Sequence, residues 1–197
     1  REFKKKKILK IVILNYLKKI GTNQSIEEIE DLNSLYKNFD LKKFSKSSVF
    51  FEPNDIDRIN SKYIKTLDSN TIKNIYNLDF EHSFWMVIRS NVDSIDEALE
   101  WYNLVKKEFR IKNKIILSRN LKKTIIKCAP NKVSNNFWVD WTAKILSDFD
   151  IKPKKLYIMM REIITGKKYG PAMNDLLTLI EKDEIIKRVE CNCEEED

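Results

Sequence analysis

The strongest periodic pattern lies near the start of the chain. Between residues 5 and 20, apolar residues recur at steps of three and four positions, and Gly21 follows where a left-handed cap would end a helix. This spacing places the apolar side chains on one face, so it predicts a helix over residues 5–20 that buries that face. Its apolar members are Ile8, Leu9, Val12, Ile13, Tyr16, Leu17 and Ile20.

Two more helices of the first half are indicated by the residues that would begin them. Asp31 can accept hydrogen bonds from the free amides of a first turn, which predicts a short helix through Asn38. Pro53 has no amide to leave unsatisfied in a first turn, which predicts a helix to about Thr66. Residues 45–52 between them are expected to form a loop.

Short apolar clusters separated by polar junctions follow. A polar junction at residues 67–70 marks the first expected boundary, and a short helix around residues 72–76 comes after it. Residues 84–90 predict one or two buried turns. Residues 94–97 read Ser-Ile-Asp-Glu, which has the spacing of a capping box and predicts a helix that ends near Phe109.

Residues 111–127 fit two structures. The Ile-Ile-Leu run at 115–117 would suit a strand, whereas Leu117, Leu121, Ile125 and Cys128 recur at helical steps. We favour a helix over this segment. Beyond it, four further helices are expected, each from a residue that caps or breaks one.

These helices of the last third are predicted as follows. Ser134 is expected to cap one that carries several aromatic residues, and Pro153 to begin the next, which Gly166 ends. Pro171 should open a third, and Asp183 should cap the last before an acidic tail that frays. Two tryptophans within the first of these helices, Trp138 and Trp141, are assigned to the core.

The composition favours an all-α fold. Of 197 residues, 42% are apolar, whereas only three are Gly and four are Pro, fewer than strands and hairpins usually need. The longest apolar run, residues 11–14, is far too short for a membrane span. Three cysteines, an odd number in a chain of this size, make disulfides an unlikely source of stability and fit a cytoplasmic protein.

Charge permits a polyanionic partner without demonstrating one. Lys and Arg outnumber Asp and Glu by 37 to 30. Lysines crowd the start of the chain at residues 4–7, 10, 18 and 19. Such an excess fits RNA, and it fits equally a solvated surface of a lysine-rich protein.

The sequence offers few residues for catalysis or metal binding. His82 is the only histidine, which excludes His-rich metal centres, and no residue is assigned a catalytic role. Cys191 and Cys193, with Cys128 and His82, do not have the spacing of a zinc site, so no metal is expected. Residues 166–170 (Gly-Lys-Lys-Tyr-Gly) lack the pattern of a phosphate-binding P-loop, and turn chemistry alone favours an ordinary corner between two helices.

A resemblance to a known family changes that interpretation. Residues 160–171 read Met-Arg-Glu-Ile-Ile-Thr-Gly-Lys-Lys-Tyr-Gly-Pro, and with residues 174–177 and 182–189 they resemble the closing segment of bacterial glutamyl-tRNA synthetases. That family has Leu-Arg, Leu-Thr-Gly, Gly-Pro, Leu-Leu and Gly-Lys-Glu in this order, and Glu181 replaces its last Gly. Residues 14–21 and 84–91 are similar to earlier blocks of the family, in the same order.

One motif invites a wrong interpretation. Residues 43–47 (Lys-Phe-Ser-Lys-Ser) imitate the loop with which class I synthetases hold ATP phosphates. Their neighbours at 39–41 and 51–53 instead resemble the stem-contact region downstream of that loop, and no His-Ile-Gly-His counterpart occurs. We therefore reject an ATP site in this segment.

The resemblance implies a tRNA-binding fragment without the catalytic domain. It divides the chain into part of a stem-contact domain at residues 1–67, a first anticodon-binding subdomain at 68–110 and a second at 111–197 with the acidic tail. The fragment would need no cofactor, because ATP and Mg would bind the missing half of a parent that attaches glutamate to tRNA(Glu). We expect a monomer that binds neither DNA nor membranes; whether the parent also charges tRNA(Gln) stays open.

The resemblance also implies roles for individual residues. The anticodon-contacting residues would be Arg89, Asn91, Tyr169, Gly170, Pro171 and Met173. The phosphate-binding residues would be Lys5, Lys6, Arg161 and Lys167. Structural alternatives remain for three of them: Arg89 pairing with Glu81 or Asp93, Met173 in the core, and Tyr169 merely closing the corner.

A different class of function is also open. A basic helical adaptor could use the tryptophans with Met159 and Met160 as a surface for a protein partner, or bind RNA without specificity. Binding assays with matched and scrambled anticodon stem-loops would separate these alternatives.

Overall fold

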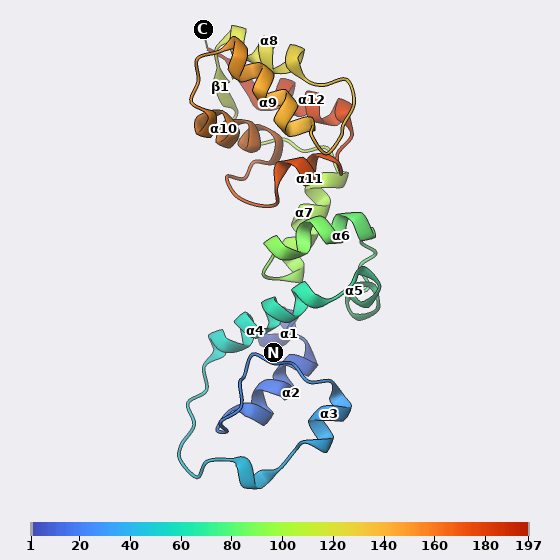
Figure 1. The fold of residues 1–197 in the computed structure, drawn as a ribbon, viewed down its shortest axis with the longest axis vertical. Helices are drawn as coiled ribbons and strands as arrows, with labels where there is room; N and C mark the ends of the chain where they lie inside the picture. The colour runs from blue at the N-terminus through green and yellow to red at the C-terminus, as the bar shows by residue number, and fades with distance from the viewer. Residues whose placement is uncertain (1, 197) are drawn as a thin grey trace. The chain divides into compact units, whose positions relative to one another are not determined.

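A computed structural model describes residues 2–196 of the chain and confirms the all-α class (Figure 1). It forms two compact units: unit 1, Arg1–Phe80 with Val92–Leu99, and unit 2, Glu81–Asn91 with Glu100–Asp197. The expected boundaries at 67/68 and 110/111 fall inside these units, and the three-part division stays a prediction. None of the described helices combines the length and the apolar character needed to cross a membrane.

Unit 1 is built from short helices around one core. Its elements are α1 (Glu2–Lys5), α2 (Lys10–Lys19), α3 (Leu32–Lys37), η1 (Leu41–Lys43), α4 (Pro53–Thr66), α5 (Ser69–Tyr76) and the start of α7 (Ile95–Lys106). Helices α2 and α4 pack together, and Val12, Ile56 and Ile59 between them are fully buried. Apolar burial of this kind, more than helix propensity, stabilises such short helices.

The helix predicted over residues 5–20 is wrong at its start. Lys7 has a φ of 53°, a left-handed conformation that stops α1, and α2 begins only at Lys10. The amide of Leu9 donates to the buried Asn60 side chain at 3.0 Å, so a tertiary contact replaces the expected helical hydrogen bond. Gly21 is left-handed as predicted, with a φ of 83°.

The predicted starts of α3 and α4 are confirmed. The Asp31 side chain accepts hydrogen bonds from the amides of Asn33 and Ser34 at 2.9 and 3.0 Å. Helix α4 begins at Pro53 and ends at Thr66. Residues 45–52 form the expected loop.

Unit 2 is larger and holds most of the aromatic core. Its elements are α6 (His82–Ile88), η2 (Arg89–Asn91), the rest of α7, β1 (Ile115–Leu117), α8 (Arg119–Cys128), α9 (Phe137–Asp148), α10 (Pro153–Thr165), α11 (Met173–Leu177), α12 (Lys182–Asn192) and β2 (Cys193–Glu195). Helices α8, α9, α10 and α12 pack on one another (Figure 1). Phe137, Trp141, Ile145, Ile163 and Ile185 at their centre are fully buried.

Two predictions for unit 2 fail for the same reason. Residues 115–117 form strand β1 where a helix was favoured, and the tail expected to fray forms β2. The strands pair in parallel, with Ile115 opposite Cys193, so each depends on a partner far along the chain. Cys193 is consequently buried, 3% exposed.

Several helix ends in unit 2 also differ from expectation. Helix α7 ends at Lys106, three residues before Phe109, and α11 begins at Met173 instead of Pro171. The helix predicted to be capped by Ser134 is preceded by Asn136, and Asp183 lies inside α12. Offsets of one or two residues at helix ends are common.

The predicted starts of α7, in unit 1, and of α10, in unit 2, are confirmed. Ser94 accepts a hydrogen bond from the amide of Glu97 at 3.2 Å, and the Glu97 carboxylate accepts one from the Asp93 amide at 2.8 Å. Helix α10 begins at Pro153 and ends at Gly166, whose φ of 65° is left-handed.

Candidate nucleic-acid interface

The candidate site is the corner of residues 166–171, which joins α10 to α11. Thr165, the last residue of α10, donates its hydroxyl to the carbonyl of Arg161 at 2.7 Å. The same hydroxyl accepts from the amide of Lys167 at 3.1 Å. The corner is thereby attached to the helix that precedes it.

Trp101 on α7 packs against the corner. The ring is almost fully buried, and a Cβ atom on Gly170 would lie only 2.5 Å from it. Gly170 also has a φ of 148°, so glycine is required on both grounds. The ammonium of Lys167 lies 5.0 Å from the centre of the Trp101 ring and 3.1 Å from the carboxylate of Glu100.

Arg161 supports the corner from α10. Its Nη2 donates to the carbonyl of Pro171 at 2.9 Å, whereas its Nη1 is buried without a hydrogen-bond partner. Burial lowers the pKa of this guanidinium. The side chain predicted to bind phosphate is therefore half-buried beneath the corner, with one donor left unsatisfied.

A cavity of about 190 Å³ has Arg161 in its lining. Its lining residues are Trp138, Tyr157, Ile158, Arg161 and Met173. The rings of Trp138 and Tyr157 are tilted against each other, with centroids 5.9 Å apart. The cavity thus has two aromatic rings and a guanidinium side chain in its lining, a combination of apolar and polar groups that is typical of ligand sites.

Of the two tryptophans assigned to the core, one lines the cavity and the other is confirmed as a core residue. Trp138 is only half-buried and lines the cavity, whereas Trp141 is fully buried and donates its Nε1 to the carbonyl of Ile125 at 2.7 Å. Met173, 4% exposed, serves both as core and as cavity wall. Tyr169 is 86% exposed, so its ring stands free of the corner that it was thought to close.

Arg89 and Asn91 lie in η2, directly after the buried residues of α6. The amide of Arg89 donates to the carbonyl of Trp85, whereas its side chain makes no hydrogen bond or ion pair with the described residues. Its two suggested partners are engaged elsewhere: Glu81 with Lys106 at 2.7 Å, and Asp93 with Lys65 at 2.8 Å. No hydrogen bond or ion pair within residues 2–196 joins Arg89 or Asn91 to the corner.

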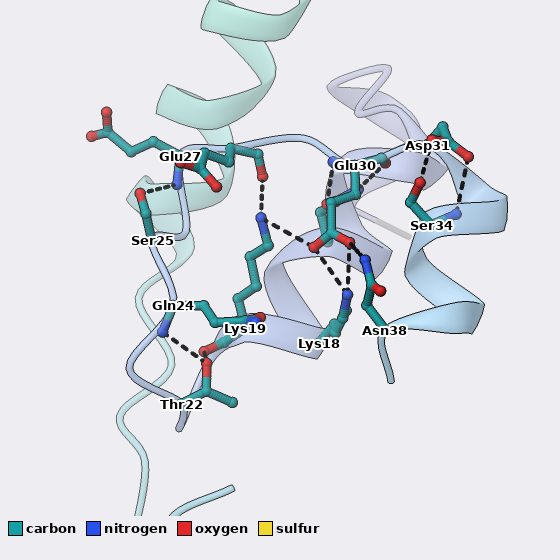
Figure 2. A network of polar contacts seen from close by, with 12 residues as sticks. Lys18, Lys19, Thr22, Gln24, Ser25, Glu27, Glu30, Asp31, Ser34 and Asn38 are labelled. Carbon is teal, nitrogen blue, oxygen red and sulfur yellow. Dashed lines mark hydrogen bonds and ion pairs between the residues drawn. The ribbon is translucent and has the colours of Figure 1, made fainter. Parts of the chain in front are cut away.

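The lysines near the start of the chain divide into two groups. Lys18 and Lys19 are buried, 7% and 2% exposed, and both meet the carboxylate of Glu30 (Figure 2). Lys6 pairs with Asp57 at 2.6 Å, and Lys5 is exposed. Only part of the basic cluster is therefore available to a polyanion.

Glu30 organises the network that buries the two lysines. Lys18 lies 2.9 Å from both of its carboxylate oxygens, and Asn38 donates to one of them at 3.0 Å. These hydrogen bonds, that of Lys18 foremost, lower the pKa of the Glu30 carboxyl. The Asn15 side chain on α2 accepts from the backbone amide of Glu30 at 2.8 Å and donates to its carbonyl at 2.9 Å, which fixes the loop before α3 onto α2.

Comparison with known proteins identifies the family. Residues 94–193, which include the corner and the cavity, match the family described as "Anticodon binding domain". The chain belongs to this family. The predicted resemblance to glutamyl-tRNA synthetases is confirmed by the curated relatives below.

Two relatives and one solved structure show how far the similarity extends. "Glutamate--tRNA ligase 1" of Rickettsia bellii (strain OSU 85-389) is 27% identical over 91% of this chain and 41% of its own length. That of Wolbachia sp. subsp. Brugia malayi is 30% identical over 96% of this chain and 43% of its own length. The chain thus spans about two-fifths of these relatives.

The solved structure shares the fold. A glutamate-tRNA synthetase from Elizabethkingia anophelis superposes with a TM-score of 0.70 at 14% identity, covering 91% of this chain and 39% of that protein. At such low identity the superposition shows the shared fold and does not assign roles to individual residues.

Within this anticodon-binding domain, sequence reasoning missed the residues that shape the site. Glu100 and Trp101 hold Lys167 and Gly170, yet Trp101 reads in the sequence as an ordinary apolar position of a helix. Trp138 and Tyr157 come from different helices, and no spacing along the chain brings them together.

The structure also weakens the adaptor alternative. Trp85 and Trp141 are fully buried, Trp101 is 3% exposed and Met160 is 1% exposed. The aromatic docking surface that an adaptor would need is therefore not formed by these residues. For metals, residues 2–196 contain no group of three or more His, Cys, Asp or Glu side chains placed to hold an ion.

Proposed function

We propose that this chain reads the anticodon of tRNA(Glu), as the anticodon-binding part of a glutamate–tRNA ligase. The observation that carries the proposal is the pairing of a corner held by Trp101 and Arg161 with an adjoining cavity that Trp138, Tyr157 and Arg161 line. Proteins recognise single-stranded RNA by stacking unpaired bases on aromatic rings and bonding their edges.

The size of the cavity suits a single base. At about 190 Å³ it is smaller than the roughly 300–1,000 Å³ of pockets for drug-sized ligands. As a lining residue of the cavity, Arg161 would be a base reader, and not the phosphate ligand that the sequence suggested.

The rest of the corner supports the same role. Tyr169 offers an exposed ring for stacking, Met173 lines the cavity, and Gly170 and Pro171 are held against Trp101 and Arg161. Lys167 is held by Glu100, an exposed ion pair that a phosphate could replace at little cost. Arg89 and Asn91 are proposed to contact another base of the anticodon.

Position on the tRNA is proposed to come from charge. Lys5 and Lys6 would bind backbone phosphates without reading sequence. The whole ligase would attach glutamate to tRNA using ATP and Mg in the cytoplasm, with the present residues contributing recognition alone. A monomer is the simplest assembly for this role, and a second tRNA, tRNA(Gln), is a natural competitor to include in assays.

A binding assay tests the proposal. Fluorescence anisotropy at moderate salt should show preference for the tRNA(Glu) anticodon stem-loop over a scrambled loop of the same length. Tyr169→Ala with Pro171→Ala should reduce that preference by about 5- to 150-fold, the equivalent of about 1–3 kcal/mol per stacked base. Equal affinity of the unaltered protein for both loops would refute the anticodon function.

Two controls separate recognition of the bases from electrostatic attraction to the RNA backbone. Tyr36→Ala removes another exposed aromatic side chain, 72% exposed in unit 1, and should leave the preference unchanged. Lys5→Ala with Lys6→Ala should weaken both RNAs alike and reduce the salt dependence of binding.

A further inference from the structure

Arg188 on α12 is buried completely, although arginine is rarely found in a core. Its guanidinium donates to the carbonyls of Leu104 and Lys107 at 2.7 and 3.2 Å, at the end of α7. It also donates to the carbonyl of Ile164 at 3.1 Å, at the end of α10. Carbonyls in the last turn of a helix have no partner within that helix, so one side chain completes two helix ends.

Asn192, one turn further along α12, repeats the arrangement. It is fully buried, and its Nδ2 donates to the carbonyl of Ile163 at 2.7 Å, again at the end of α10. Its Oδ1 accepts from the amide of Ile111 at 3.2 Å, in the segment that follows α7. Both polar side chains therefore connect the same two parts of unit 2.

These contacts lead directly to the first residue of the corner. The Phe109 ring lies 5.4 Å from the Arg188 guanidinium, and the Phe109 amide donates to Glu184, which also pairs with Arg188. Phe109 also lies against Gly166: a Cβ there would be 2.8 Å from Cζ of the ring and 3.1 Å from the Ile111 side chain.

The opposite end of the corner depends on α7 as well. Trp101, one turn before the carbonyl of Leu104 that Arg188 holds, supports Gly170. The two supports of the corner, Phe109 with Ile111 at its start and Trp101 at its end, therefore belong to segments that Arg188 and Asn192 fix.

We propose that Arg188 and Asn192 are positioning residues for the RNA-binding corner: they determine where Gly166 and Gly170 are held, and through this the preference among RNAs, without contacting RNA. The inference rests on the proposed anticodon function. The planar guanidinium suits the task because it directs several donors in fixed directions, which the ammonium of a lysine does not.

Arg188→Lys is the most informative variant, because it keeps the charge and loses the fork of donors. The preference for the tRNA(Glu) stem-loop over the scrambled loop should fall about tenfold, within the range that small misplacements in a binding site produce. Affinity for the scrambled loop should stay unchanged. Arg188→Ala should behave alike, and added ethylguanidinium should restore the preference, while ethylammonium should not.

A matched control distinguishes positioning from stability. Trp141→Phe removes a buried hydrogen bond between α9 and the carbonyl of Ile125 on α8, in the core of the same unit. It should lower thermal stability and leave the preference of the folded protein intact. The proposal is overturned if Arg188→Lys keeps the wild-type preference, or if Trp141→Phe loses it to the same extent.

A second measurement needs no RNA and keeps the two proposals separable. Hydrogen exchange read by mass spectrometry should show faster exchange in residues 166–171 of Arg188→Lys, with α9 unchanged. If the unaltered protein shows no RNA preference, the anticodon function fails and this exchange pattern alone decides the positioning role. Unchanged exchange in the corner would refute it.

Discussion

Two pairs of adjacent lysines lie beside a left-handed glycine, one in each unit, and their surroundings differ completely. Lys18 and Lys19, before Gly21, are buried around the carboxylate of Glu30 (Figure 2). The side chains of Lys167 and Lys168, after Gly166, are 39% and 64% exposed, and each faces one carboxylate at the surface.

The difference shows that burial, and not residue type, decides what a lysine pair can do. A buried ammonium cannot leave its carboxylate without a large desolvation cost, so the first pair serves the fold. An exposed ion pair contributes about 0–1 kcal/mol, so the second can exchange a carboxylate for an RNA phosphate. The comparison yields predictions for both pairs.

The largest effect is expected at Glu30. Glu30→Ala leaves two buried ammonium groups without their carboxylate and should destabilise unit 1 by about 2–3 kcal/mol, below the about 3–5 kcal/mol of fully buried pairs because Glu30 is 21% exposed. Urea unfolding with hydrogen exchange of residues 10–40 measures it. Glu100→Ala removes the partner of Lys167 and should change the free energy of unfolding by less than about 1 kcal/mol. Equal losses of stability in the two variants would contradict the difference between the lysine pairs.

The two glycines give the next largest contrast. Gly170→Ala would drive a methyl group into the rigid Trp101 ring and should cost about 2–3 kcal/mol, together with the RNA preference. Gly21→Ala meets a methyl of the partly exposed Val49, which can move, and should cost about 1 kcal/mol, mainly from backbone strain. Thermal unfolding measures the stability of both variants, and fluorescence anisotropy measures their RNA preference. A larger loss of stability for Gly21→Ala than for Gly170→Ala would contradict this account.

Acid should weaken the buried pair selectively. The pKa of Glu30 is lowered below its ordinary value of 4.5, so its contribution is present above pH 4.5 and is lost as the pH falls through the lower folded value. The difference in unfolding free energy between the unaltered protein and Glu30→Gln should therefore shrink as the pH falls from 4.5 through the lowered folded pKa. A difference that stays constant over this range would exclude Glu30 as the titrating group.

The smallest effect is expected at Lys167. Lys167→Ala removes an exposed ion pair and should change stability by less than about 1 kcal/mol. It should weaken the tRNA(Glu) stem-loop and the scrambled loop about equally, with a smaller salt dependence in the anisotropy titration. Loss of preference without loss of affinity would instead make Lys167 a base reader.

Local signals in the sequence determined much of the helical framework. Pro53, Pro153 and Gly166 restrict their own backbone or lack a donor, so the helix ends that they mark follow from single residues. Asp31 likewise needs only the amides two and three residues ahead. The family blocks around the corner were recognisable for a similar reason, because they are contiguous.

Tertiary structure decided the features that depend on distant partners. Ile115 became a strand residue because Cys193 pairs with it, and α2 starts late because Asn60 captures the amide of Leu9. Charge counts could not separate the buried Lys19 from the exposed Lys167, since each pairs with a carboxylate from another segment. The chain supplies each of these groups, and only folding fixes the distances between them.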